Sequence, residues 1–101
     1  MAKETWTQLK ARLIKERGHI CERCRTQDAT DLHHSLIGRM KRKPELNVQY
    51  NAELLCKECH ANAGSYNERL AFWRRQCVRY GEDVMVDWYD NLSLLIKEQF
   101  E

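Results

Sequence analysis

Residues 51–60 read NAELLCKECH, and residues 21–24, far earlier in the chain, read CERC. Each stretch contains a Cys-x-x-Cys pair. Two residues between cysteines let both sulfurs reach one tetrahedral metal ion, at about 2.3 Å from each sulfur. The two pairs therefore predict one structural zinc site with four thiolate ligands: Cys21, Cys24, Cys56 and Cys59.

The alternatives to zinc are disulfides or two redox-active pairs, which a reducing compartment disfavours. Two further residues could join such a site. Cys77 lies on the apolar face of an expected helix, where a small core residue is the better interpretation. His19 precedes the first pair by two residues, and we expect it on the surface.

Length and composition favour a small globular protein. The chain has 101 residues, 43% of them hydrophobic and 32% charged, which suits one domain spanning residues 1–101. No apolar run is long enough to span a bilayer, and MAKETWTQLKARL lacks the apolar core of a signal peptide. We therefore expect a cytoplasmic protein without a membrane partner. The net charge of +2 does not by itself argue for nucleic acid.

Helices are expected at both ends, with a small β element between them. The N-terminal helix covers residues 5–17, with Thr5 and Gln8 forming a capping box. The stretch TDLHHSLI at residues 30–37 predicts a short strand, and a second strand is expected before Asn51. Between them, residues 38–49 predict a loop. A helix then begins within CKECHANAG at residues 56–64.

Two more helices are expected after residue 64. The first has an apolar face at helical spacing and ends near Gly81; this face comprises Tyr66, Leu70, Trp73, Cys77 and Tyr80. Asp83 is expected to cap the second, whose apolar face comprises Val84, Trp88, Leu92 and Leu95. The fold class is therefore α+β and mostly helical, with residues 1–17, 18–64 and 65–101 as an N-terminal helix, a central zinc-clipped segment and C-terminal helices.

The order of the central motifs resembles one enzyme family. A Cys-x-x-Cys pair, then His33-His34 in an apolar strand, then Asn51-x-x-x-Leu-Cys-x-x-Cys-His60 is similar to the zinc-knuckle branch of the HNH endonucleases. The resemblance covers about residues 18–64. It implies a small ββα-metal (His-Me finger) core clipped by the four-cysteine zinc knuckle, and hydrolysis of DNA phosphodiester bonds.

The resemblance also implies roles for single residues. His34 would be the general base, and His33 and His60 would hold a catalytic divalent ion such as Mg²⁺, Mn²⁺ or Ni²⁺. Asn51 would order the loop between the strands and orient the base. The products would be a 5′-phosphate and a 3′-hydroxyl. This chemistry suits histidine, which titrates near neutral pH, and a divalent ion, which stabilises developing negative charge.

The loop before Asn51 carries a cluster of cations that could contact a DNA backbone, namely Arg39, Lys41, Arg42 and Lys43. We expect double-stranded DNA as the partner, with low sequence specificity; a phage setting or a larger protein partner of a phage or restriction system is compatible with this. The alternative is a zinc-stabilised DNA-binding or protein-interaction module without catalysis, for which the three histidines would be unnecessary.

Overall fold

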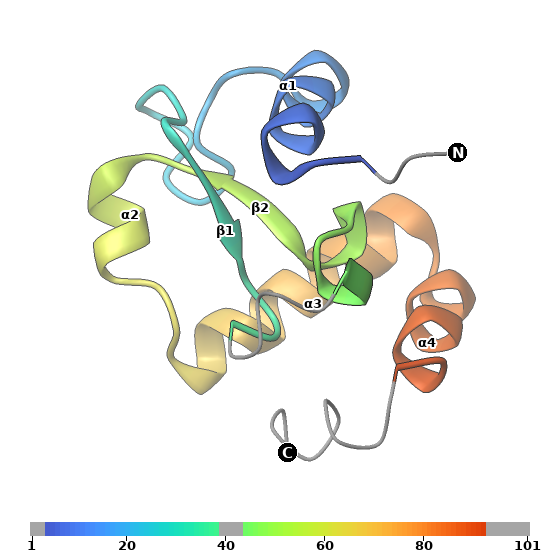
Figure 1. The fold of residues 1–101 in the computed structure, drawn as a ribbon. Coiled ribbons are helices and arrows are strands. Elements are labelled where there is room, and N and C mark those ends of the chain that lie inside the picture. The colour runs from blue at the N-terminus through green and yellow to red at the C-terminus, as the bar shows by residue number, and fades with distance from the viewer. Residues whose placement is uncertain (1–3, 39–43, 93–101) are drawn as a thin grey trace.

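The computed structural model describes residues 4–38 and 44–92. It is a mixed helical and β structure with a two-stranded antiparallel sheet. In chain order, the helices and strands are α1 (Trp6–Arg17), β1 (Asp31–His34), β2 (Ala52–Leu55), α2 (Lys57–Ala61), α3 (Tyr66–Tyr80) and α4 (Glu82–Asp90), with short 3₁₀ turns at Pro44–Leu46 and Gln49–Asn51. Figure 1 shows the two strands side by side, with α1 and α2 to either side of them in this view. Within the described residues, no helix is long and apolar enough to cross a membrane.

Helix α1 begins and ends where the sequence predicts. Thr5 and Gln8 form a complete capping box, since each side chain binds the backbone of the other residue. Gly18 follows with a φ of 90°, which an L-residue rarely adopts, and its N–H binds Ile14. Leu9 and Leu13 are fully buried, so this face of α1 packs on the sheet.

The first strand lies within its predicted range, but the predicted position of the second was wrong. Strand β2 follows Asn51 rather than preceding it. Residues Gln49–Asn51 form a 3₁₀ turn that leads directly into β2. All four residues of β2 are buried, so it lacks the exposed alternate positions that mark a half-buried strand. In the ladder His33 pairs with Glu53, and His34 pairs with Ala52.

Helix α3 ends at Gly81 as predicted, and its predicted apolar face is confirmed in part: Trp73, Cys77 and Tyr80 pack against the core while remaining partly exposed. Phe72 and Gln76 are its buried residues, whereas Tyr66 is 70% exposed. Gln76 is buried without an unsatisfied amide nitrogen, because its Nε2 donates to the carbonyls of Gln49 and Tyr50. The predicted face Tyr66–Tyr80 is thus only partly buried.

Helix α4 differs from its prediction in its cap, whereas its predicted apolar face is confirmed in part. Gly81 precedes it without a side-chain cap, and Asp83 lies inside the first turn. Leu92 is buried and Trp88 packs against the core, as predicted, whereas Val84 is 39% exposed and the buried Met85 was not predicted. Leu95 lies outside the described residues.

The buried side chains form three clusters that meet around the sheet. One joins the loop after β1 to α3 and α4, and includes Leu36, Ile37, Leu46, Phe72, Met85 and Leu92. The second packs α1 against the strands through Leu9, Leu13, Leu32, Ala52 and Leu54. The third surrounds the cysteines and comprises Cys21, Leu55 and Cys56. The strands therefore pack against α1 and, at Leu55, against the cysteines, whereas α3 and α4 pack against residues that follow β1 and precede β2.

Candidate functional site

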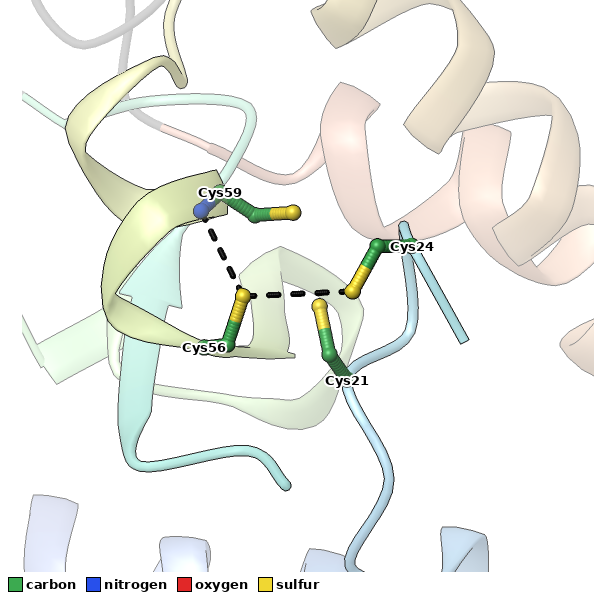
Figure 2. A group of neighbouring side chains, drawn as sticks. All are labelled: Cys21, Cys24, Cys56 and Cys59. Atoms are coloured by element: carbon green, nitrogen blue, oxygen red, sulfur yellow. Dashed lines mark hydrogen bonds between the residues drawn. The ribbon is translucent and has the colours of Figure 1, made fainter. Parts of the chain in front are cut away.

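The two Cys-x-x-Cys pairs meet at one point. The ligand atoms of Cys21, Cys24, Cys56 and Cys59 all lie within 4.8 Å of one another. Figure 2 shows the four side chains converging from two separate segments, the turn after α1 and the start of α2. Cys24 Sγ lies 3.9 Å from Cys56 Sγ, and Cys56 Sγ accepts from the Cys59 N–H. This arrangement is compatible with a zinc site.

The electrostatics of the cluster suit a bound cation. Hydrogen bonds from Thr26 and from the backbone of Gln27 lower the pKa of Cys24 to about 6. Burial, followed by the neighbouring sulfurs, raises the pKa of Cys59 to about 12. Four thiolates at this spacing would repel one another, and a divalent ion would supply the missing positive charge.

The residues between the first two cysteines anchor the turn in the fold. Glu22, whose side chain is 4% exposed, binds Arg17 of α1 and Arg79 of α3, and it accepts from the Leu54 N–H at 2.6 Å. Arg23, whose side chain is 9% exposed, binds Glu53 of β2 at 3.1 Å. The turn is thus tied to two helices and one strand by charged groups, and the Cys-x-x-Cys spacing alone does not reveal this.

The three motif histidines lie around one pocket of about 440 Å³, which is lined by Trp6, Leu32, His33, His34, Gly38 and His60. The rings of His33 and His60 contact edge to face, with centroids 4.8 Å apart. The structure therefore brings together the histidines that the sequence analysis singled out.

The two adjacent histidines of β1 contact different helices. Neighbouring strand residues point to opposite faces. His33 accordingly contacts His60 of α2, whereas His34 stacks on Trp6 of α1, with centroids 3.9 Å apart and an angle of 2° between the rings. Because β1 ends at His34, both rings still reach the same pocket.

His60 is hydrogen-bonded to a carboxylate directly, and His33 is linked to one through a serine hydroxyl. Asp31 Oδ2 lies 2.8 Å from His60 Nδ1, and the hydrogen bond with His60 lowers the pKa of Asp31. His33 Nδ1 lies 2.8 Å from Ser35 Oγ, which donates to Glu53 Oε1 at 2.8 Å. A carboxylate only accepts hydrogen bonds, so Asp31 accepts from the Nδ1–H of His60. Because Ser35 donates its own proton to Glu53, its Oγ accepts from the Nδ1–H of His33. Their Nε2 atoms then hold the lone pair that a metal requires.

His34 has a different partner. Its Nε2 lies 2.8 Å from Oδ1 of Asn47, a residue of the segment between the strands. An amide oxygen also only accepts, so the His34 proton is on Nε2. The tautomer of His34 is thus the opposite of that of His33 and His60.

Asn51 is fully buried and binds both ends of the segment between the strands. Its Oδ1 accepts from the N–H groups of Leu36 and Ile37, and its Nδ2 donates to the carbonyls of Ile37 and Leu46. These four bonds join the residues after β1 to those before β2. The hydrogen bond described above to the His34 ring comes from Asn47.

The remaining candidates are more peripheral. The side chain of His19 is 69% exposed and lies 3.5 Å from Asp28, in agreement with a surface position. Cys77 packs beside the cluster of Phe72 and Met85, and burial raises its pKa. Arg39, Lys41, Arg42 and Lys43 lie outside the described residues.

Metal-ligand geometry distinguishes the two candidate metal sites. Within residues 4–38 and 44–92, the four cysteines are the one group of three or more metal-binding side chains close enough to share an ion. A second ion near His33 and His60 would thus have two protein ligands. Water and substrate oxygens would complete its coordination, as is usual for Mg²⁺.

Sequence reasoning missed the partners of the histidines. Asp31 and Ser35 each lie two residues from His33. Residues two apart in an extended segment point to the same side, so the sequence could have indicated that both side chains lie near the His33 side of the strand. Glu53, Asn47 and Trp6 come from other segments, and only the tertiary structure brings them near.

Comparison with protein-family models, with curated proteins and with solved structures finds no match for this chain.

Proposed function

We propose that the protein is a small metal-dependent endonuclease of the HNH type, in which β1, β2 and α2 form a ββα-metal core that hydrolyses DNA. The observation that carries the proposal is the arrangement of His33, His34 and His60 around one pocket. A strand, Asn51, a second strand and a helix follow one another in the order that the motif resemblance implies, and Asn51 binds residues on both sides of the segment between the strands.

Two histidines have the donor atoms for a divalent ion. The rings of His33 and His60 are in contact, and each is backed through Nδ1 by a carboxylate, directly or through Ser35. Such outer partners fix the tautomer of a metal-ligating histidine and raise its basicity. Mg²⁺, Mn²⁺ or Ni²⁺ held there would supply positive charge to the phosphate and to the departing oxygen.

His34 serves as the general base in this proposal. It accepts one proton from a water molecule, and the water oxygen bonds to phosphorus. The bond between phosphorus and the 3′ oxygen breaks, and that oxygen takes a proton from solvent. The products are a 5′-phosphate and a 3′-hydroxyl, and His34 then returns its proton to solvent.

The four cysteines hold a structural Zn²⁺ that fixes where His60 lies. His60 directly follows Cys59, and α2 begins at Lys57 with Cys56 as its N-cap. A metal that clamps Cys56 and Cys59 to the turn after α1 therefore sets the position of His60 relative to β1.

The test is plasmid cleavage by the intact protein and by His34→Ala, each with zinc content measured and with Mg²⁺, Mn²⁺ or Ni²⁺ added. We expect the parent to cut and the variant to lose cutting by about 100-fold or more with its zinc and melting temperature retained. His19→Ala is the matched control, because His19 is exposed and remote from the pocket. If neither the parent nor the control cuts with any ion while both bind DNA, the non-catalytic DNA-binding module replaces this proposal.

The cations between the strands are proposed to contact the DNA backbone. Binding that neutralises phosphates weakens with salt in proportion to the number of contacts. Replacing Lys41, Arg42 and Lys43 together by alanine should therefore flatten the dependence of DNA affinity on salt. An unchanged slope would exclude these residues from the interface.

A further inference from the structure

Two residues outside the histidine motif hold His34 from different directions. Trp6, near the start of α1, stacks on the ring with an interplanar angle of 2°. Asn47, in the segment before β2, binds the ring edge at Nε2 through its amide oxygen at 2.8 Å. One contact fixes the plane of the ring and the other fixes its rotation within that plane.

The hydrogen bond also decides which nitrogen is basic. Because Asn47 Oδ1 cannot donate, Nε2 carries the proton and Nδ1 carries the lone pair. The neighbouring His33 has the reverse assignment, since its Nδ1 donates to Ser35 Oγ, which in turn donates to Glu53. Two adjacent histidines thus present different nitrogens, and the structure assigns each tautomer through a separate acceptor.

Both contacts have structural support of their own. Trp6 packs beside Leu9 and Leu13 on the inner face of α1. The start of α1 is fixed by the Thr5 capping box and by Arg12, which binds Glu4 through two hydrogen bonds. Asn47 follows Leu46, a fully buried residue whose carbonyl accepts from Asn51. Neither Trp6 nor Asn47 is therefore carried by a loosely attached segment.

We propose that Trp6 and Asn47 are positioning residues for His34, holding its ring so that Nδ1 is the nitrogen that accepts the proton from water. The inference rests on the proposed nuclease function for its chemistry. It extends the site beyond the strands and α2 to include α1, which carries no recognised motif. A displacement of about 1 Å at a reacting group can lower a rate about 100-fold, so two such contacts can have a large effect on turnover.

The first test uses nuclear magnetic resonance of the zinc-loaded protein at about pH 8, above the usual histidine pKa of about 6.5. We expect the His34 ring to carry its proton on Nε2, protected from exchange, with ring protons shifted upfield by the indole. Asn47→Leu should remove the protection, whereas Asn47→Asp, which keeps an acceptor oxygen, should retain it. Asn67→Leu, on the exposed first turn of α3, is the matched control and should change nothing.

Trp6 is tested by two variants that both keep an apolar side chain on α1. Trp6→Phe retains an aromatic face and should keep part of the upfield displacement of the His34 ring protons. Trp6→Leu should lose it while the capping box and zinc content remain. A His34 ring that carries its proton on Nδ1 in the parent, or resonances that do not respond to either substitution, would overturn the inference.

Cleavage kinetics separate positioning from DNA binding. Asn47→Leu and Trp6→Leu should each lower kcat by about 10- to 100-fold with little change in KM, and Trp6→Phe should recover part of the loss. A loss confined to KM would contradict a positioning role. If the parent does not cleave DNA but the resonance results are as expected, the nuclease proposal fails while the assignment of Trp6 and Asn47 as positioning residues of the ring stands.

Discussion

His33 and Glu53 lie directly opposite each other in the β1–β2 ladder, and the hydroxyl of Ser35 joins them. Glu53 has a side chain that is 1% exposed, and it also binds Arg23 of the cysteine turn and Arg75 of α3. A single buried carboxylate therefore connects a motif histidine with the first cysteine pair and with a C-terminal helix.

Removing the charge of Glu53 should destabilise the protein strongly. Glu53→Gln leaves the buried Arg23 guanidinium without its buried partner, which typically costs about 3–5 kcal/mol. Urea unfolding of the zinc-loaded protein measures this loss. Glu68→Gln is the matched control, because Glu68 also binds Arg23 but is 44% exposed, and its loss should cost about 1 kcal/mol or less. Equal effects of the two substitutions would contradict the importance of burial.

The Asp31–His60 contact should matter for divalent-ion binding more than for stability. Asp31→Ala removes the carboxylate that holds His60 Nδ1 and should weaken binding of Mn²⁺ at the pocket by about 10- to 100-fold. Calorimetric titration with Mn²⁺ of the zinc-loaded protein measures the affinity. Asp28→Ala disrupts the other histidine–aspartate pair, with His19, and should leave the affinity unchanged. An unaltered affinity in Asp31→Ala would argue against His60 as a ligand.

Asn51 should tolerate no substitute. Asn51→Leu leaves four buried backbone groups without their partner and should cost about 3 kcal/mol or more. Asn51→Asp should also destabilise, because it places a carboxylate oxygen against the carbonyls of Ile37 and Leu46. Asn91→Leu removes one exposed bond to Asp87 and serves as the control. Urea unfolding compares the three, and a stable Asn51→Asp variant would be the contrary result.

Removal of zinc should unfold the protein. Structural zinc commonly contributes about 10 kcal/mol or more of apparent free energy in small domains. Without the ion, Cys21 and Cys24 would no longer be linked to the start of α2. Glu22 and Arg23, which lie between these two cysteines, would then lose their fixed positions. Chelation followed by far-UV circular dichroism and thermal melting tests this. Unchanged ellipticity and melting after the metal is gone would refute a structural role.

Local signals predicted those parts of the fold that depend on neighbouring residues. The capping box of Thr5 and Gln8, the stop at Gly18 and the spacing of the cysteines all act within a few positions of the chain. The mixed fold and the meeting of the two cysteine pairs followed from such signals.

The errors concern residues whose partners are distant in sequence. Strand β2 was placed on the wrong side of Asn51 because nothing local indicates that its side chain binds Leu36, Ile37 and Leu46. The prediction for α3 missed its two fully buried residues, Phe72 and Gln76; a polar residue such as Gln76 is buried only because its bonds to distant carbonyls compensate for the loss of water. The sequence analysis missed Glu53 and Asn47 for the same reason, because their partners are brought near only by the tertiary structure.

Asn51 closes a ring of backbone around the segment between the strands, since it binds the residues on both sides of that segment. A single buried side chain therefore fixes the spacing between the residues that follow β1 and those that precede β2. His34 and Asn47, which are hydrogen-bonded to each other, flank these positions. The alignment of the His34 ring therefore also depends on the Asn51 amide.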